Sequence, residues 1–330
     1  MSLKNLQFQK VTVTTTARLH MGFIDLNGSA GRLFGSLGLA LDSPTTQLEI
    51  TRSKKTLIDA KNQFNVLNIV EKIIKELNLE SGVSVKINEH IPAHAGLGSG
   101  TQMALAIGAG LNALFDLNLS ATQLATITNR GARSGIGIGT FEQGGLVLDG
   151  GRNLKGSLLP PIIARQVFPE DWPILLILDD ADQGVFGDEE LQAFETLPKS
   201  SLADAQQLSH AVLMQALPAI VERDYAQFCQ AINALQLATG RYFAAAQGGH
   251  YKSSAVASVL NYLDNEGVMG KGQSSWGPTG FAIFNSEARA SGMLNQLRQQ
   301  FSVSQNNRFE SLRFQIVHAK NTGATIQLSH

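Results

Sequence analysis

A glycine-rich segment in the first third of the chain has the residue types of a phosphate-binding loop. It is His94-Ala-Gly-Leu-Gly-Ser-Gly-Thr-Gln102, between a predicted strand (83–87) and an apolar stretch that predicts a buried helix (103–115). Glycines let backbone N–H groups approach an anion, and the positive end of the helix dipole attracts negative charge. The hydroxyls of Ser99 and Thr101 can cap the helix, bind a phosphate oxygen or hold a magnesium ion. The segment therefore predicts a phosphate site, and a glycine-rich turn with an ordinary helix cap is the alternative.

The spacing of this segment separates it from two familiar phosphate-binding motifs. No Lys-Ser/Thr pair follows its glycines, so it is not a Walker A loop. It also lacks the G-x-G-x-x-G spacing after a first strand that marks a dinucleotide-binding fold. The candidate phosphate-binding residues are His94, Gly96, Leu97, Gly98, Ser99, Gly100, Thr101 and Gln102.

Two further segments combine polar side chains with glycines beside predicted strands. One covers residues 17–28 and continues to Arg32, and the other covers residues 272–280. Binding and catalytic residues concentrate on loops that a rigid scaffold carries. A structural ion pair is the alternative interpretation of Arg18 and Asp25. The candidate residues in these segments are Arg18, His20, Asp25, Asn27, Arg32, Ser274, Ser275 and Trp276.

The composition is that of a folded protein that binds neither nucleic acid nor a membrane. Its 330 residues are enough for two hydrophobic cores, and 43% of them are hydrophobic against 16% charged. The net charge is −1, so no broad positive field attracts nucleic acid. No window reaches the roughly 18 apolar residues of a membrane span. Residues 1–9 lack the features of a signal peptide.

The chain has one cysteine, Cys229, which excludes internal disulfides and cysteine-rich zinc sites and fits a cytoplasmic location. It lies in a predicted helix, where we expect a buried, inert thiol rather than a nucleophile. The acid-rich stretch 179–190 is interpreted as a solvated loop rather than a dedicated metal site.

The periodicity of apolar residues predicts strands and helices in alternation, without tandem repeats, and hence an α+β or α/β class. The predicted strands are 11–16, 39–41, 46–50, 83–87, 145–148, 172–178, 281–284 and 313–317. The predicted helices are 64–77, 103–115, 122–130, 202–217, 220–237, 253–264 and 291–300, with a glycine-punctuated loop at 133–139 and a helix break near Pro218. The strand 172–178 opens a second half, so we place a domain boundary near residue 170, within about ten residues.

Three motifs in this order resemble the GHMP kinase superfamily, which is named for galacto-, homoserine, mevalonate and phosphomevalonate kinases. They are the strand motif from Arg18, the loop Pro92-x3-Gly-Leu-Gly-Ser99 and the glycine-rich segment from Gly272, and they span nearly the whole chain. The resemblance implies an α+β protein with a ribosomal-S5-like N-terminal domain (1–170), a ferredoxin-like C-terminal domain (171–330) and an active site between them.

The detailed residues are most similar to one branch of that superfamily, the β-ribofuranosylaminobenzene 5'-phosphate synthase family. The matching stretches are 18–28, 91–102, 133–139, 141–145, 149–151 and 272–280. The resemblance implies a pentosyltransferase of tetrahydromethanopterin synthesis, which joins 4-hydroxy- or 4-aminobenzoate to phosphoribosyl pyrophosphate and releases carbon dioxide and pyrophosphate. We also expect a homodimer that uses magnesium, with Ser99 and Thr101 as candidate ligands, and no organic cofactor.

One departure separates this sequence from the kinases of the superfamily. Many of them carry Ser-Gly-Ile/Val-Asp, whose Asp is the candidate base for the accepting hydroxyl, whereas Ser134-Gly-Ile-Gly137 ends in glycine. An enzyme that displaces pyrophosphate has no such hydroxyl to deprotonate. Glu142 nearby can take the place of the missing carboxylate. An ATP-dependent small-molecule kinase is therefore the alternative function, and the neutral charge disfavours a nucleic-acid-binding protein.

The implied reaction assigns roles to the candidate residues. The loop 96–102 is the expected pyrophosphate cradle. Asp25 or Glu142 is expected to stabilise the oxocarbenium ion that develops on the ribose, by analogy with glycoside hydrolysis. The residues expected to position the carboxylate of the acceptor are Arg18, His20 and Arg32.

The remaining candidates are expected around the 5'-phosphate and the aromatic ring. His94 either contacts the 5'-phosphate or the leaving group, or it caps or packs the loop. Ser274, Ser275 and Trp276 are expected to line the far wall of the cleft. Trp276 is either an aromatic platform for the benzoate ring or a core residue. Further candidates are Tyr242, Phe243 and Gln247.

Overall fold

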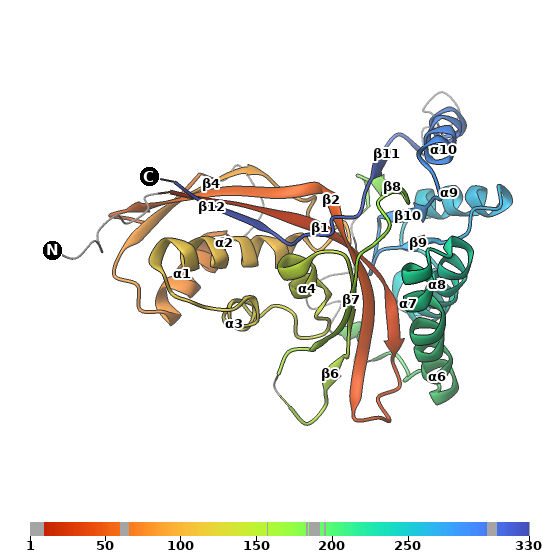
Figure 1. Ribbon diagram of the computed structural model, residues 1–330, viewed down its shortest axis with the longest axis horizontal. Helices are drawn as coiled ribbons and strands as arrows, with labels where there is room; N and C mark the ends of the chain where they lie inside the picture. The colour runs from red at the N-terminus through yellow and green to blue at the C-terminus, as the bar shows by residue number, and fades with distance from the viewer. Residues whose placement is uncertain are drawn as a thin grey trace.

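The computed structural model describes residues 10–59, 66–156, 158–182, 184, 192–194, 196–301 and 309–329. They form two sheets, each accompanied by helices, as Figure 1 shows. The arrangement is α+β, as predicted.

The first sheet is built on two long antiparallel strands, β1 (Lys10–Asp25) and β2 (Arg32–Ser53). Its order is β12-β1-β2-β4-β3, while β5 and β6 also pair with β2 and β7 pairs with β5. The shorter strands are β3 (Leu57–Asp59), β4 (Gly82–Glu89), β5 (Leu146–Asp149), β6 (Arg152–Asn153), β7 (Ile162–Gln166) and β12 (Thr325–Ser329). The helices beside this sheet in Figure 1 are α1 (Val66–Glu76), α2 (Ser99–Phe115), α3 (Ala121–Ile127) and α4 (Ile136–Gln143).

The second sheet is smaller and antiparallel, with the order β11-β8-β10-β9. Its strands are β8 (Ile174–Asp179), β9 (Lys271–Gln273), β10 (Gly280–Ile283) and β11 (Leu312–Val317). The helices of this half are α6 (Leu202–Ala211), the π-helix η1 (Val212–Ala216), α7 (Leu217–Glu222), α8 (Tyr225–Gln247), α9 (Ser254–Asn265) and α10 (Glu287–Gln300).

The chain changes sheets between β7 and β8 and then returns to the first sheet at its end. Strand β12 pairs antiparallel with β1, with Val11 opposite Leu328 and Val13 opposite Ile326. A division at residue 170 therefore leaves this last strand hydrogen-bonded to the preceding half.

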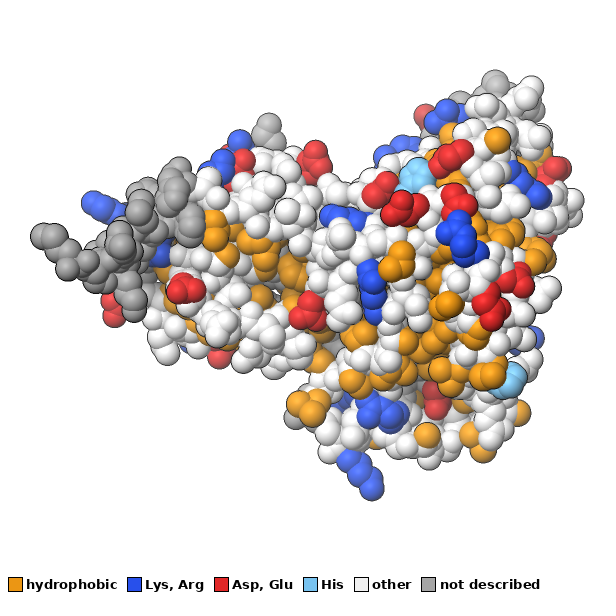
Figure 2. All heavy atoms as spheres, in the orientation of Figure 1, with side chains coloured by type: hydrophobic (Ala, Val, Ile, Leu, Met, Phe, Trp, Pro, Cys, Tyr) orange, Lys and Arg blue, Asp and Glu red, His pale blue; other side chains and the backbone are white. Residues whose placement is uncertain are grey.

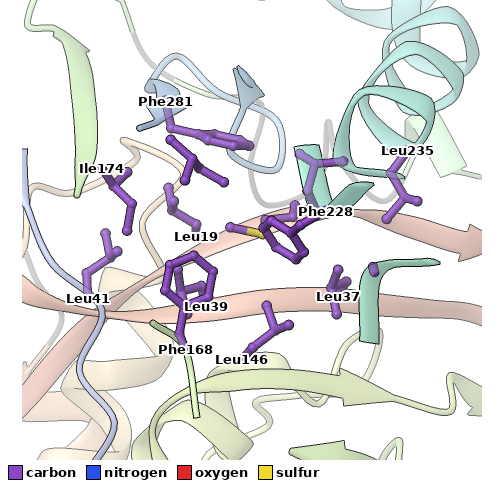
Figure 3. Close-up of a cluster of buried hydrophobic side chains, with 14 of the residues drawn as sticks. Leu19, Leu37, Leu39, Leu41, Leu146, Phe168, Ile174, Phe228, Leu235 and Phe281 are labelled. Carbon is purple, nitrogen blue, oxygen red and sulfur yellow. The ribbon is translucent and has the colours of Figure 1, made fainter. Parts of the chain in front are cut away.

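An apolar cluster joins the two halves (Figure 3). Leu19 and Leu39 come from the long strands of the first sheet, Phe281 comes from the second, and Phe228 and Leu235 come from α8. All five are fully buried. Burial of a side chain of this size stabilises a fold by about 1.5–3 kcal/mol. The cluster therefore fixes the position of strand β1 relative to helix α8.

Strand β1 carries the N-terminal motif on a rigid support. The predicted strand 11–16 continues to Asp25, and its pairing with β2 shifts between Thr16 and Arg18 and again between His20 and Gly22. An irregularity of this kind bends a strand and re-aims the side chains around it. The polar residues of the motif therefore stand on the end of a strand rather than on a free loop.

Two local predictions are wrong for identifiable reasons. The loop predicted at 133–139 contains the start of α4, whose glycines permit close packing: a Cβ at Gly137 would lie 2.9 Å from Thr101 Cγ2. The helix break predicted near Pro218 falls instead at Arg223, which has a φ of 60°. Pro218 lies in the first turn of α7, where a helix tolerates proline.

Two expectations about the helices can be compared with the structure. Cys229 is buried on α8, and burial raises the pKa of its thiol to about 12, which confirms the prediction of an inert side chain. Among the helices that the structure describes, none is long and apolar enough to cross a membrane.

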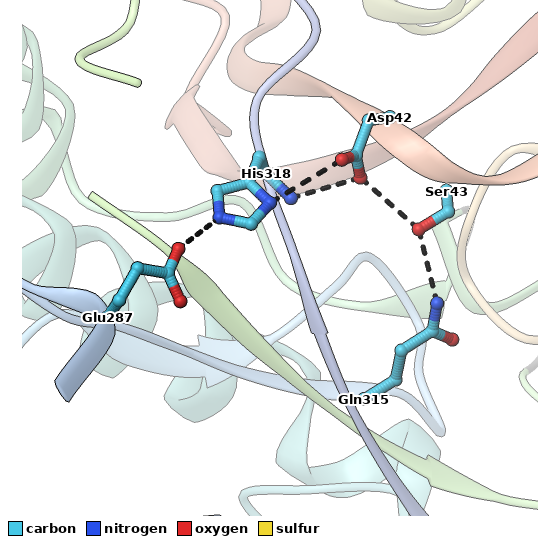
Figure 4. A network of polar contacts seen from close by, with 5 residues as sticks. All are labelled: Asp42, Ser43, Glu287, Gln315 and His318. Carbon is cyan, nitrogen blue, oxygen red and sulfur yellow. Dashed lines mark hydrogen bonds and ion pairs between the residues drawn. The ribbon is translucent and has the colours of Figure 1, made fainter. Parts of the chain in front are cut away.

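A polar network centred on His318 also connects the halves (Figure 4). The imidazole bonds Glu287 of α10 and lies 3.5 Å from the Asp42 carboxylate of β2. The backbone N–H of His318 donates to Asp42 at 3.0 Å, and Gln315 donates to Ser43 at 3.1 Å. The hydrogen bond to Glu287, followed by the charges of both carboxylates, raises the pKa of His318 above 6.5.

We predict that His318→Gln destabilises the protein more at low pH than at high pH. The folded-state pKa is raised, so the stabilisation is present below the unfolded value of 6.5 and is lost as the pH rises through the folded value. The side chains are partly exposed, so the expected loss is at most about 1 kcal/mol. Urea unfolding of both proteins at about pH 6 and about pH 9 measures it. An equal difference at both pH values would contradict this role.

Candidate active site

The glycine-rich loop lies between strand β1 and the segment 274–278. Gly96 and Gly98 have φ values of 76° and 81°. A Cβ at Gly96 would lie 2.4 Å from the Ser274 carbonyl oxygen, and one at Gly98 would lie 3.0 Å from Arg18 Cγ. Glycine is therefore required at both positions, because the backbone is left-handed and the space beside it is filled.

Helix α2 begins directly after this loop, and its N-terminus has no side-chain cap among the described residues. Gly98 occupies the N-cap position, where a serine or aspartate would otherwise accept a hydrogen bond from the first turn. The N–H groups at Ser99 and Gly100 precede the first helical hydrogen bonds, which Thr101 and Gln102 donate to Gly98. The alternative of an ordinarily capped turn is therefore wrong, and the helix end suits an anion.

Arg18 holds the glycine-rich loop in place through two hydrogen bonds. Its guanidinium donates to the Gly96 carbonyl at 2.5 Å, and its backbone N–H donates to the Leu97 carbonyl at 3.1 Å. The side chain is half-buried. Arg18 therefore lies against the predicted phosphate site, rather than with the residues that line the large cavity beside helix α8.

Two arginines that the sequence reasoning missed also lie near the site. The Arg130 guanidinium would lie 3.4 Å from a Cβ at Gly100, and its Nε has no hydrogen-bond partner in the described structure. Burial lowers the pKa of Arg130. The Arg133 guanidinium lies 5.3 Å from the centroid of the Phe194 ring. The spacing Arg-x-x-Arg directly before Ser134-Gly-Ile-Gly137 is the signal that was available in the sequence.

His20 is buried beside the loop, with 3% of its surface exposed. Its backbone N–H donates to Ser274 Oγ at 3.0 Å, and its carbonyl accepts from the Ser275 N–H at 3.1 Å. Neither ring nitrogen has a partner in the described structure, although both are buried. Burial, followed by the positive charge of Arg18, lowers the pKa of His20 to about 3. The neutral imidazole therefore offers one donor and one acceptor to a bound molecule.

The segment after β9 connects this histidine to the loop. Ser274 is fully buried, and its hydroxyl donates to the Gly96 carbonyl at 2.7 Å while it accepts from His20. Ser275 has a φ of 55°. The structure thus brings the second and third motifs into direct contact, across 178 positions of sequence.

Trp276 lies in the core and does not line an open wall. It is 3% exposed and packs against Phe243 at a centroid distance of 4.1 Å and against Phe194 at 5.5 Å. Phe23 and Phe34 belong to the same cluster. Of the two predictions for Trp276, the core residue is the one the structure shows. Its indole Nε1 has no partner among the described residues.

Asp25, Asn27 and Arg32 hold the turn between β1 and β2. The Asp25 carboxylate accepts from the N–H groups of Asn27 and Gly28 at 2.7 and 2.9 Å. Asn27 donates to the Ser200 carbonyl at 2.7 Å, and Arg32 donates to the carbonyls of Gly150 and Gly151. No ion pair joins Asp25 to Arg18 in the described structure, so that alternative is wrong. These contacts are structural, since local backbone groups already use the polar atoms involved.

His94 and Glu142, two other predicted site residues, are both exposed. His94 is exposed at the start of the loop with a φ of 56°, its carbonyl accepts from the Gly184 N–H, and burial of part of the ring lowers its pKa. Glu142 is exposed at the end of α4, and its carbonyl would lie 2.4 Å from a Cβ at Gly323. The structure therefore places Glu142 at the end of α4 opposite to the one that faces α2.

A buried carboxylate that the sequence reasoning did not select organises the start of α4. Asp149 accepts from the hydroxyls of Ser36 and Ser134 and from the N–H groups of Gly135 and Gly151. Burial raises its pKa despite these four hydrogen bonds. Asp149 positions α4, from which the Gly137 carbonyl accepts a hydrogen bond from Gln102 at 2.8 Å. The predicted binding residue Gln102 therefore connects two helices.

Comparisons with known proteins identify the class of this fold. The family model described as GHMP kinases N terminal domain matches residues 65–144, and the model described as GHMP kinases C terminal matches residues 216–303. The crystal structure of homoserine kinase from Cytophaga hutchinsonii superposes with a TM-score of 0.68 over 99% of both chains, at 15% sequence identity. The chain therefore has the GHMP kinase fold.

Two archaeal relatives identify the family within this class. The beta-ribofuranosylphenol 5'-phosphate synthase of Archaeoglobus fulgidus is 33% identical over 327 residues, which cover 95% of this chain and 98% of that protein. The protein of the same name from Methanocaldococcus jannaschii is 35% identical over 299 residues, with coverages of 82% and 88%. The chain belongs to this synthase family, which confirms the predicted resemblance.

We predict that Gly98→Ala weakens anion binding without unfolding the protein. A left-handed alanine costs roughly 1–2 kcal/mol, and its methyl group would push against Arg18 and disturb the start of α2. Calorimetric titration with pyrophosphate should show a loss of affinity of about tenfold or more, the equivalent of one charge-assisted hydrogen bond. Gly292→Ala on α10 is the control, because its methyl group would meet nothing within 4 Å. If Gly98→Ala binds pyrophosphate as tightly as Gly292→Ala does, the loop is not part of the anion-binding site.

We predict that the His20 ring stays neutral throughout the physiological pH range. Its pKa of about 3 follows from burial and from the neighbouring Arg18 charge. Nuclear magnetic resonance of the histidine ring nitrogens, with His20→Gln for assignment, should show no protonation between about pH 5 and pH 8, where an unperturbed histidine titrates. Titration of this ring near its ordinary pKa would contradict the buried position.

Proposed function

We propose that this protein is a β-ribofuranosylphenol or β-ribofuranosylaminobenzene 5'-phosphate synthase. It transfers phosphoribose from phosphoribosyl pyrophosphate to 4-hydroxybenzoate or 4-aminobenzoate and releases carbon dioxide and pyrophosphate. The observation that carries the proposal is membership of the synthase family over 95% of the chain. The uncapped start of α2 with arginines nearby supports it, because the donor and the leaving group are polyanions.

The reaction balances without removal of a hydroxyl proton. The bond from ribose C1' to the pyrophosphate oxygen breaks, and the oxygen keeps the electron pair. A new carbon–carbon bond forms between C1' and the ring carbon that bears the carboxylate. The bond to the carboxylate then breaks, and its electron pair restores the aromatic ring as carbon dioxide leaves. Gly137, which occupies the position of the kinase aspartate, is compatible with this chemistry.

The residues around α2 supply the charge that the leaving group requires. Backbone N–H groups at Ser99 and Gly100 point from the helix end, and the hydroxyl of Thr101 stands in the same turn. Arg130 adds a partly buried positive charge, and Arg18 holds the loop in place. Preorganised donors of this kind stabilise the charge that develops on a departing pyrophosphate.

Magnesium is part of the proposal as a companion of the pyrophosphate group. The described residues contain no group of three or more His, Cys, Asp or Glu side chains that could hold a metal ion. Magnesium commonly binds through substrate phosphates and retains several waters, so it needs few protein ligands, and the hydroxyls of Ser99 and Thr101 are the candidates here. When bound, the ion would neutralise charge on the leaving group.

The proposal also covers the setting of the enzyme. We place the reaction in tetrahydromethanopterin synthesis, in the cytoplasm, and assign it to the pentosyltransferases. A homodimer is part of the proposal, supported by exposed apolar residues on helices η1 to α8: Leu213, Met214, Val221 and Leu237. Figure 2 shows hydrophobic side chains gathered over this side of the molecule. Apolar patches of this kind favour contact with another protein surface.

We predict that the purified protein releases labelled carbon dioxide from carboxyl-labelled 4-hydroxybenzoate when phosphoribosyl pyrophosphate is added and ATP is absent. An ATP-dependent kinase of the same fold would instead consume ATP and phosphorylate a hydroxyl. Omission of phosphoribosyl pyrophosphate is the control. Carbon dioxide release that requires ATP, or an absence of release with either benzoate, would end the synthase proposal.

On the face in Figure 2, basic and acidic side chains are interspersed, which gives no support to a nucleic-acid-binding function.

We predict that Arg130→Gln lowers kcat/KM for phosphoribosyl pyrophosphate by about 10- to 100-fold, because one charge-assisted contact to an oxyanion contributes roughly 1.5–3 kcal/mol. The KM for the benzoate should change little. Arg298→Gln, at an exposed position of α10, is the matched control and should retain wild-type kinetics. A selective effect on the benzoate would place Arg130 in the acceptor site instead.

A further inference from the structure

A cavity of about 470 Å³ lies beside the end of strand β1, separate from the glycine-rich loop. Residues 198–201 and helices α6 and α8 form its other walls. Its size is that of a small-molecule site. Trp276, for which a place on the cleft wall was one of two predictions, is absent from its lining. The cavity is therefore large enough to be a candidate binding site for a small molecule.

The charged groups of the cavity favour an anion. Lys199 and Arg241 both line it, both are exposed, and neither forms an ion pair with another described residue. Asp204 is the one carboxylate among the described lining residues. It accepts a hydrogen bond from the hydroxyl of Ser201, which in turn caps the first turn of α6 by accepting from the Asp204 N–H. Among the described lining residues there are thus two cations and one carboxylate, and that carboxylate already has a local partner.

The inner surface of the cavity is apolar. Phe23, Leu26 and Leu208 line it and are buried, so they supply its apolar area. Together with Lys199 and Arg241, these residues favour a molecule with an apolar body and an anionic end.

We propose that this cavity binds the aromatic acid acceptor, an inference that rests on the proposed function. The ring packs against Phe23 and Leu26, and the carboxylate lies against Lys199 and Arg241.

The cavity is connected to the phosphate loop by a short series of contacts. The Phe23 ring packs on the His20 ring at a centroid distance of 4.5 Å, His20 donates to Ser274, and Ser274 donates to Gly96. Phe23 is three residues from His20 on β1, a separation of about 10 Å along a strand. The proposal therefore extends the ribose of a donor at the start of α2 along this end of β1 toward the cavity.

The 5'-phosphate of the phosphoribosyl donor is the competing occupant of the cavity, because it is an anion like the carboxylate of the benzoate. The apolar lining favours the benzoate, and two probes separate the sources. Calorimetric titrations with 4-hydroxybenzoate and with ribose 5-phosphate, each with and without saturating pyrophosphate, are compared for the wild type, Lys199→Gln and Arg241→Gln. Arg298→Gln controls for the loss of an exposed positive charge.

We expect each cavity variant to weaken 4-hydroxybenzoate binding by about tenfold, the equivalent of one charge-assisted contact. Ribose 5-phosphate and pyrophosphate should bind as in the wild type. Unchanged benzoate affinity, a loss confined to ribose 5-phosphate, or no benzoate binding by the wild type under either condition would overturn the proposal. If benzoate binds as expected but carbon dioxide is not released with the donor, the proposed function fails while the assigned pocket stands.

Discussion

The uncapped N-terminus of helix α2 is the feature on which the rest of this site depends. Helix α2 has 17 residues, most of them buried, and the positive end of its dipole lies at Ser99. The N-cap position, which often holds a capping side chain, is occupied by Gly98. This arrangement leaves polar N–H groups without a partner from the chain, and it is stable when solvent or an anion supplies one. The proposed phosphate binding rests on that requirement more than on any single side chain.

The remainder of the molecule keeps this helix end open and in position. Arg18 and Ser274 bond the same carbonyl, that of Gly96, from two different motifs. The apolar cluster shared by β1, the second sheet and α8 fixes those motifs relative to one another. Asp149 and Gln102 fix helix α4 against α2. The precision of the loop is thus a property of long-range packing rather than of its own residues.

The sequence predicted those features that local residue types determine. The glycine loop, the buried helix after it and most strands follow from periodicity and from the demand for glycine at left-handed positions. The bond between His20 and Ser274 joins residues 254 positions apart, so no local pattern announces it. The sequence around Trp276 does not show whether the side chain lines a cleft or lies in a core. Its burial depends on packing against Phe194 and Phe243, which are distant in sequence. Helix α4 was missed because packing overrides the low propensity of glycine.

The family relation and the geometry of the site are both compatible with a phosphate-bearing ligand. The fold is shared with homoserine kinase, but a side chain at position 137 would press on Thr101, which lies 2.9 Å from the position of a Cβ there. In this chain the uncapped start of α2 occurs together with a separate cavity lined by apolar residues, Lys199 and Arg241.

A crystal structure of the protein with pyrophosphate is the decisive measurement. We expect the anion at the start of α2, with its oxygens accepting hydrogen bonds from the N–H groups of Ser99 and Gly100 and from the Arg130 guanidinium. Pyrophosphate bound elsewhere, with α2 closed by a side-chain cap, would contradict it.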